Sequence, residues 1–133
     1  MKAYLAIKFH GDCKNRETIE KISESLQNAG FNSVVMIRDY EKWGKVKFAP
    51  EELMKHTFKL IDESELLVVE FSEKGVGLGI EAGYACAKNK PVIVIAKRDS
   101  DISTTLRGIS KNVFFYDEPE ELTEKFKNLK LCH

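Results

Sequence analysis

The sequence predicts an α/β fold in which a doubly wound, five-stranded parallel sheet carries helices on both faces. Short apolar runs typical of buried strands alternate five times with segments whose apolar residues recur at helical spacing. One of these runs, Pro91 to Ala96, is apolar throughout, as expected of a strand covered on both faces. Strands and helices that alternate in this way form a three-layer sandwich of the flavodoxin-like or Rossmann-like kind.

The length and composition suit one compact domain, which we expect to span residues 1–133. The chain has 133 residues, and 43% of them are hydrophobic, which is enough for a core. Lys and Arg number 21 and Asp and Glu also number 21, so the formal net charge is zero. We therefore expect no nucleic-acid partner, because general nucleic-acid binding needs a basic surface.

The first half of the chain predicts two strands and two helices. Apolar residues at helical spacing define one face of the first helix, and Gly30 marks its end. Pro50 is well placed to open the second helix. The expected elements are, in order, a strand over 4–7, a helix over 16–29, a strand over 33–37 and a helix over 50–63.

A long polar loop from Asp39 to Pro50 precedes the second helix. It contains Tyr40, Trp43 and Phe48, and three lysines alternate with these aromatic residues. A loop of this length in a small domain is more often functional than idle. Its aromatics and lysines could stack on a base and contact a phosphate. The aromatics could equally pack on the sheet edge or on a partner subunit, and the sequence alone does not choose between the two.

Thr57 is a polar residue on the otherwise apolar face of the second helix. Leu53, Leu60 and Ile61 share that face, which should pack on the sheet. We expect the hydroxyl of Thr57 to bond back to its own helix.

The second half of the chain is organised around a glycine-rich stretch from Gly75 to Gly83. A buried strand precedes it, and a helix of small residues follows. This layout lets backbone N–H groups approach a ligand closely. The stretch is not a phosphate-binding P-loop, because no Gly-Lys-Ser/Thr follows. The expected elements are a strand over 66–71, a helix over 82–88, a strand over 91–96, a short helical turn over 103–108, a strand over 113–116 and a helix from 119.

Glu81 stands in what we expect to be the first turn of the helix after the glycines. The helix dipole favours a carboxylate at that place, so the side chain should stay ionised near neutral pH. An ionised carboxylate beside an open turn can act as a nucleophile. A first-turn glutamate is also common for dipole reasons alone, and by itself the stretch favours that plainer interpretation.

The cysteine pattern and the hydropathy indicate a cytoplasmic protein without a membrane partner. No apolar run approaches the length of a membrane span. The N-terminus has a strand pattern rather than that of a signal peptide. Cys13, Cys86 and Cys132 are far apart and odd in number, which indicates reduced thiols. Cys13 lies near the expected site, where an incidental role is favoured over a reactive one.

Ligands in this fold bind at the carboxyl ends of the strands, where the loops after the first four strands converge. These loops comprise residues 10–14, 39–47, 75–81 and 98–107. They make His10, Asp39 and Trp43 candidate substrate-binding residues, together with Gly75, Gly77, Gly79, Ser103 and Arg107.

Residues 56–108 resemble the nucleoside 2-deoxyribosyltransferase superfamily, and within it the branch of 2'-deoxynucleoside 5'-monophosphate N-hydrolases. The resemblance depends on the strand from Leu66 to Phe71, the segment from Gly77 to Ala85, the Lys90-Pro91-Val92 sequence and the segment from Ser103 to Gly108. It covers somewhat under half of the chain, and the combination is more specific than any single piece.

The resemblance implies that Glu81 attacks the anomeric carbon of the sugar while the base leaves. A carboxylate suits this reaction, because cleavage of an N-glycosidic bond passes through a cation-like sugar. The resemblance also implies that Ser103 offers its hydroxyl to a 5'-phosphate across a homodimer interface. Arg107 could pair with the same phosphate or form a structural ion pair.

The sequence departs from the family pattern at several positions. A gapless alignment through Glu81 puts Thr57 where the family has an aspartate that assists the leaving base. Gly75 stands where the N-hydrolase branch has a phosphate-binding serine, and the family's serine-containing turn after the first strand is replaced by Ile7 to Gly11. A threonine cannot act as a general acid at neutral pH, so His10, His56 or Asp39 would have to supply the proton.

Three functions follow from the sequence. The first is an N-glycosidase that hydrolyses a nucleoside 5'-monophosphate with Glu81 as nucleophile. The second is a nucleotide-binding module that has lost catalysis, and the third is a deoxyribosyltransferase. We expect no cofactor, and we expect no metal site because the histidines and cysteines form no ligand pattern.

Overall fold

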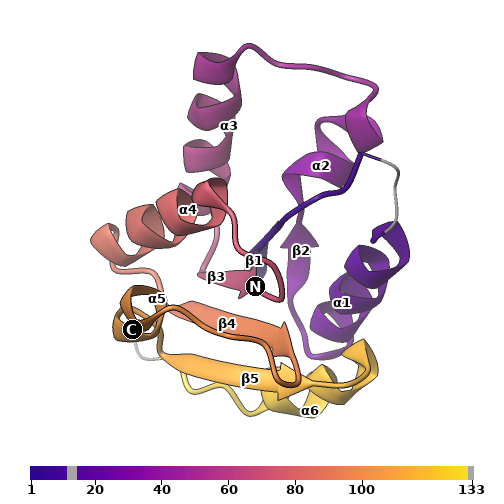
Figure 1. The fold of residues 1–133 in the computed structure, drawn as a ribbon, viewed down its shortest axis with the longest axis vertical. Helices are drawn as coiled ribbons and strands as arrows, with labels where there is room; N and C mark the ends of the chain where they lie inside the picture. Colours follow the sequence, from indigo (N-terminus) through magenta and orange to yellow (C-terminus); the bar gives the residue numbers. More distant parts are fainter. Residues whose placement is uncertain (12–14, 132–133) are drawn as a thin grey trace.

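The protein, seen in a computed structural model that describes residues 1–11 and 15–131, is built on a five-stranded parallel sheet (Figure 1). The strand order is β2-β1-β3-β4-β5, and every neighbouring pair is parallel. The strands are β1 (Lys2–Ile7), β2 (Asn32–Val34), β3 (Leu66–Glu70), β4 (Val92–Lys97) and β5 (Asn112–Tyr116). The helices are α1 (Arg16–Asn28), α2 (Met36–Asp39), α3 (Pro50–Asp62), α4 (Val76–Ala87), α5 (Thr104–Gly108) and α6 (Leu122–Lys127), with 3-10 turns η1 (Lys42–Gly44) and η2 (Pro119–Glu121).

Helices cover both faces of the sheet, which confirms the predicted doubly wound α/β fold. On one face, α1 and α6 pack on a core that includes Leu5, Val68 and Ile95 (Figure 1). On the other face, α3, α4 and α5 pack on a core that includes Tyr4 and Val69. Alternate residues of one strand thus serve opposite faces, as the pleat requires.

The chain reverses its winding between β1 and β3. The helix that follows β1 covers one face, whereas the helix that follows β3 covers the other. Adjacent parallel strands whose connections leave in opposite directions open a crevice at their carboxyl ends. This crevice is where the fold places a ligand.

The second strand is shorter than predicted, because its last residues turn into α2. The sequence predicts a strand over 33–37, but only Asn32–Val34 pairs with β1. The Asp39 carboxylate accepts the backbone N–H of Val35 at 2.9 Å, and the backbone N–H of Asp39 donates to the Val35 carbonyl at 2.8 Å. These local bonds close a helical turn over β-branched residues that would otherwise favour a strand.

The helix after β3 begins at Val76, six residues earlier than predicted. Gly77 and Gly79 therefore lie inside α4 and do not form an open turn. The buried residues Leu78, Ala82 and Ala85 give the helix a continuous face against the sheet, which outweighs the low helix propensity of glycine. Glu81 is thus not in the first turn, and the prediction that the helix dipole holds it there is wrong.

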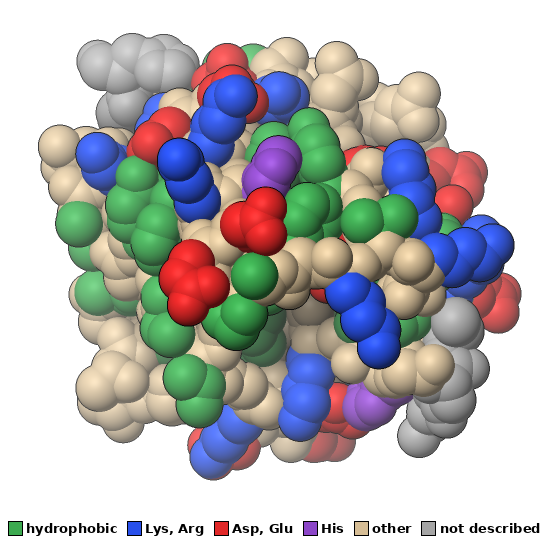
Figure 2. All heavy atoms as spheres, turned by 90° about the horizontal axis from the view of Figure 1, so that it is seen from above, with side chains coloured by type: hydrophobic (Ala, Val, Ile, Leu, Met, Phe, Trp, Pro, Cys, Tyr) green, Lys and Arg blue, Asp and Glu red, His purple; other side chains and the backbone are tan. Residues whose placement is uncertain are grey.

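Charged side chains of both signs are interspersed on the face shown in Figure 2, in keeping with the zero net charge. Within the described ranges, none of the helices combines the length and apolar character that crossing a bilayer requires. Cys86 is exposed and not in a disulfide. Cys13 and Cys132 lie outside the described residues.

Candidate active site

Glu81 faces a cavity of about 380 Å³ beside the carboxyl half of β1, on the side of the sheet that α3 and α4 cover. The walls come from β1, the segment after β2, α3 and the first half of α4. Most of the lining is apolar and includes Phe9, Met36 and Met54. The polar side chains in it are those of Tyr4, Glu41, Thr57 and Glu81. A small set of polar groups in an apolar cavity is typical of a ligand site.

The Glu81 carboxyl accepts a hydrogen bond from the Tyr4 hydroxyl at 2.9 Å, measured to Oε1. Burial raises the pKa of Glu81 from 4.5 to about 7; the Tyr4 hydrogen bond lowers it and the nearby charge of Glu41 raises it. Burial therefore outweighs the expected effect of the helix dipole. The raised pKa lets part of the Glu81 carboxyls carry a proton at neutral pH, contrary to the expectation that the helix dipole keeps the group ionised.

Tyr4 is a functional candidate that the sequence analysis missed. It lies in β1 with 2% of its surface exposed, and its ring belongs to the core. Burial raises the pKa of its hydroxyl well above the usual value, with the Glu81 charge adding to the effect. The hydroxyl therefore stays a proton donor to Glu81. A tyrosine in a buried strand is a signal in itself, because its hydroxyl needs a partner.

Glu41 is the second missed candidate. It follows α2 in the long loop and lines the same cavity as Glu81. Burial raises the pKa of Glu41 above its usual value. The sequence offered only the weak signal of an acidic residue inside a long loop rich in aromatics.

Thr57 lines the cavity, but its hydroxyl is already engaged. It donates to the Leu53 carbonyl of its own helix at 2.8 Å, which confirms the predicted back-bond. Thr57 is 2% exposed, and with Leu60 and Ile61 it forms the buried face of α3.

The predicted residues Gly75, Gly79 and Ser103 line a second cavity, of about 630 Å³, between the start of α4 and α5. Gly77, in contrast, lines the cavity of Glu81, so α4 borders both. Ser103 caps α5, because its Oγ accepts the backbone N–H of Leu106 at 3.3 Å. Arg107 is exposed on the same helix.

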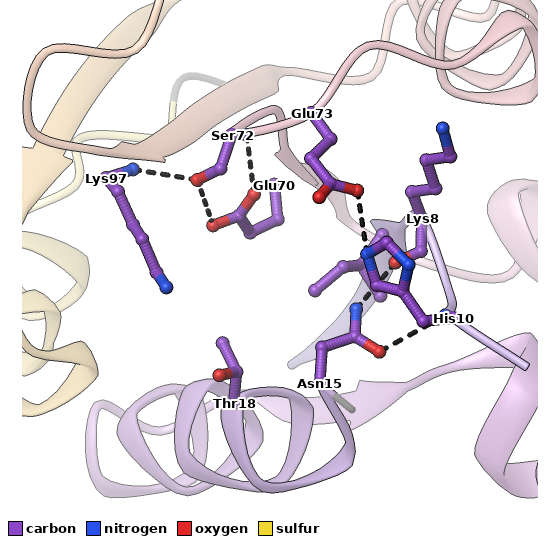
Figure 3. A pocket seen from close by; sticks show the side chains of 9 residues that line it. Lys8, His10, Asn15, Thr18, Glu70, Ser72, Glu73 and Lys97 are labelled. Carbon is purple, nitrogen blue, oxygen red and sulfur yellow. Dashed lines mark hydrogen bonds and ion pairs between the residues drawn. The ribbon is translucent and has the colours of Figure 1, made fainter. Parts of the chain in front are cut away.

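His10 lines a third, smaller cavity of about 210 Å³, shown in Figure 3. The Nε2 of His10 lies 2.8 Å from Oε2 of Glu73. The backbone N–H of His10 donates to the side-chain oxygen of Asn15. Across the cavity, the buried Glu70 carboxylate accepts the backbone N–H of Ser72 at 2.7 Å and the Ser72 hydroxyl at 2.8 Å, and it also accepts the Tyr116 hydroxyl. This cavity lies on the α1 side of the sheet.

The other predicted residues make contacts within the chain. Asp39 pairs with Arg38 at 2.9 Å besides capping α2. Trp43 packs on Phe9 with ring centroids 5.8 Å apart, and the Arg16 guanidinium lies 4.4 Å from its ring centroid.

The structure therefore divides the predicted site residues among three cavities and the loop surface. Of these residues, Gly77 and Glu81 line the cavity beside β1. Among residues 1–11 and 15–131, no three His, Cys, Asp or Glu side chains are placed to hold a metal ion.

The cavity of Glu81 has the parts that glycosidic cleavage needs. A carboxylate can stabilise a cation-like sugar or bond to it, and a second carboxyl can handle the proton of the leaving group. The apolar walls can hold a flat ring.

The comparison with known proteins agrees with this chemistry. No family model matches the chain. It is 30% identical to a protein of Thermofilum pendens named "Putative 2'-deoxynucleoside 5'-phosphate N-hydrolase 1", with 97% of this chain and 94% of that protein aligned. A protein of the same name from Methanococcoides burtonii is 27% identical, over 81% of this chain and 90% of its own.

Two solved structures have the same fold. One is the CMP N-glycosidase of Clostridium botulinum, with a TM-score of 0.69 and 20% identity, covering 94% of this chain and 96% of its own. The other is a 2-deoxyribosyltransferase of Bacillus psychrosaccharolyticus, with a TM-score of 0.71 and 13% identity, covering 98% and 93%.

Proposed function

The chain belongs to the nucleoside 2-deoxyribosyltransferase superfamily, and on that premise we propose that it is an N-glycosidase. Its reaction is the hydrolysis of the bond between the base and the ribose or deoxyribose of a nucleoside 5'-monophosphate. The observation that carries this proposal is the Glu81 carboxyl, which faces a mostly apolar cavity beside β1 and accepts a hydrogen bond from Tyr4. The names of the relatives add the substrate class.

In the proposed reaction, an ionised Glu81 oxygen bonds to the anomeric carbon C1' of the sugar. The bond from C1' to the base nitrogen breaks, and its electron pair leaves with the base. Water then attacks C1' and releases Glu81. The Tyr4 hydroxyl bonds to the carboxylate and holds the other Glu81 oxygen toward the sugar.

The 5'-phosphate is proposed to bind at the start of α4. Backbone N–H groups at a helix N-terminus favour an anion. Gly75 and Gly79 line a cavity there, together with Ser103. Following the family, we further propose that the protein is a homodimer in which Ser103 serves the neighbouring subunit.

One observation favours a second candidate, a nucleotide-binding module without turnover. On the alignment through Glu81, Thr57 takes the place of the family's acid, and its hydroxyl donates to the Leu53 carbonyl. If no other group protonates the base, binding would remain and catalysis would fail. General acid–base help contributes about a hundredfold to ten-thousandfold in rate.

Base release separates the two candidates. The purified protein would be incubated with each common ribo- and deoxynucleoside 5'-monophosphate and with the matching nucleosides, and free base measured by chromatography. The wild type should release base, whereas Glu81→Gln should lose at least about a thousandfold of that activity. Glu24→Gln, an exposed change on α1, is the matched control and should stay active.

Release that is unchanged in Glu81→Gln would refute the proposed mechanism. Saturable binding without release from any substrate would favour the binding module. Adding a second free base and looking for a new nucleoside would reveal transfer rather than hydrolysis.

A further inference from the structure

We propose that Glu41 is the general acid and base of this active site and takes over the role that the family assigns to the aspartate at the position of Thr57. The inference rests on the proposed N-glycosidase activity and deepens it. Its basis is that Glu41 and Glu81 both line the same cavity, Glu41 from the loop after α2 and Glu81 from α4.

A proton donor is needed, because a base leaves poorly as an anion. Each group that the sequence suggested is engaged elsewhere. His10 pairs with Glu73 in the cavity on the other side of the sheet. His56 lies between the rings of Tyr40 and Phe48, with centroids 5.5 and 5.2 Å away. Asp39 is bound to Arg38 and to the N-terminus of α2.

The backbone holds Glu41 firmly in place. Its N–H donates to the Met36 carbonyl at 3.0 Å, and its carbonyl accepts the N–H groups of Gly44 and Val46 at 3.0 and 2.9 Å. These three backbone bonds belong to one residue of a long loop. They fix the point from which the Glu41 side chain reaches the cavity, as a catalytic group requires.

The turn that follows Glu41 is strained, and packing maintains it. Lys42 and Trp43 have φ of 48° and 59°, the left-handed region that costs energy for residues other than glycine. Phe9 and Arg16 hold the Trp43 ring from the side of β1 and α1. Phe9 itself lines the cavity beside Glu41, so the strained turn and the cavity wall share a contact. Strain that surrounding contacts maintain is typical of functional segments.

The proposed chemistry balances in two steps. In the first step, Glu81 bonds to C1', the C1'–N bond breaks, and the Glu41 carboxyl gives its proton to the departing base. In the second step, the Glu41 carboxylate takes a proton from water as the water oxygen bonds to C1' and Glu81 leaves. The products are free base, the sugar 5'-phosphate, and both carboxyls in their starting states.

The electrostatics of the cavity show where a proton rests before the reaction. Burial raises the pKa of both carboxyls, and the charge of Glu41 raises that of Glu81 further. The shift is larger at Glu81, so in the free protein a proton held by the pair rests mainly on Glu81, and the proposed reactive form is the other arrangement, with the proton on Glu41.

A pair of substrates tests the role of Glu41. One is the nucleoside 5'-monophosphate that the wild type cleaves best. The other is the matching 4-nitrophenyl glycoside 5'-phosphate, whose leaving group needs no proton. Glu41→Gln should lose about a hundredfold or more on the nucleotide. It should lose less than about tenfold on the nitrophenyl substrate, whereas Glu81→Gln should lose both activities.

Equal losses on the two substrates would show a structural role for Glu41 and overturn the inference, as would an unchanged rate on the nucleotide. If Glu41→Gln does not fold, as judged by thermal unfolding, Glu41→Asp is measured against the same criterion of a larger loss on the nucleotide. A wild type that cleaves neither substrate would instead refute the N-glycosidase function itself.

Discussion

Glu81 is held in an environment that suits its reactivity more than the stability of the fold. Its carboxyl faces a mostly apolar cavity, and Tyr4 donates a hydrogen bond that favours its charge. A folded-state pKa of about 7 means that the folded protein binds a proton more tightly than the unfolded chain, where the group titrates near 4.5. Ionising Glu81 therefore opposes folding.

This environment predicts a pH-dependent effect of Glu81→Gln on stability. The wild type should lose stability as the pH rises from about 4.5 through about 7, because the folded carboxyl is then forced to ionise. Glutamine has no proton to lose. Relative to the wild type, the variant should gain about 1 to 3 kcal/mol in the free energy of unfolding between pH 4.5 and pH 8.

Urea unfolding of both proteins at the two pH values measures this gain. Glu24→Gln, which changes an exposed carboxylate, should show no such difference between the two pH values. If the offset between Glu81→Gln and the wild type were the same at pH 4.5 and pH 8, the raised pKa of Glu81 would be wrong.

The sequence could predict residue roles that depend on hydrogen bonds within one helix. It could not predict roles that depend on contacts between residues far apart in the chain. The back-bond of Thr57 follows from helix geometry alone, and the structure confirms it. The pairing of Tyr4 with Glu81 joins residues 77 positions apart, and Glu41 reaches the same cavity from a loop without a sequence signature.

The central strands of the sheet were predictable because β1, β3 and β4 each have a buried apolar run. β3 is buried over its whole length, and β4 over all but its last residue. Two element boundaries were not predictable. α2 exists because Asp39 caps it, and α4 includes Gly77 and Gly79 because its buried face packs on the sheet.

Strands β3, β4 and β5 are joined at their carboxyl ends by a buried polar network around Glu70. Its carboxylate accepts bonds from the Ser72 hydroxyl and the Tyr116 hydroxyl, and the Ser72 oxygen accepts the backbone N–H of Lys97 at 2.9 Å. Burial and the Glu70 charge raise the pKa of Tyr116, so its hydroxyl remains a donor. The network ties down the edge of the sheet that carries the active site.

Removing the Tyr116 hydroxyl should destabilise this edge of the sheet. Tyr116→Phe leaves the Glu70 carboxylate, 5% exposed, without one of its donors. We expect a loss of about 1 to 3 kcal/mol in the free energy of unfolding, measured by urea denaturation. Tyr40→Phe, at a more exposed ring in the loop, is the control and should change stability by less than about 0.5 kcal/mol. A Tyr116→Phe protein as stable as the control would mean that Ser72 alone satisfies the buried charge.

At the scale of the whole molecule, the candidate site residues lie in cavities on both faces of the sheet. The loops after the parallel strands all reach the same edge of the sheet, as predicted. Whether a side chain from these loops lies on the α1 face or on the α3 and α4 face depends on the winding reversal between β1 and β3. Sequence reasoning located the edge and could not assign the sides. The cavity of Ser103 lies across α4 from that of Glu81, next to an exposed apolar surface.

That surface gives the proposed homodimer its test. Val76 and Ile80 are 82% and 47% exposed and lie one helical turn apart on α4, and Val76 also lines the cavity of Ser103. Exposed apolar side chains beside a site suit an interface.

The Val76→Glu/Ile80→Glu variant should therefore be monomeric by light scattering, while the wild type is a dimer. Because Ser103 would then lack a neighbour to serve, base release from 5'-monophosphates should fall more than release from the corresponding nucleosides. Val46→Glu, a change of the same kind at a 41% exposed valine outside α4, should leave both the dimer and its activity intact. A wild type that is monomeric at assay concentration and cleaves 5'-monophosphates would confine the phosphate site to one chain and remove the role proposed for Ser103 across an interface.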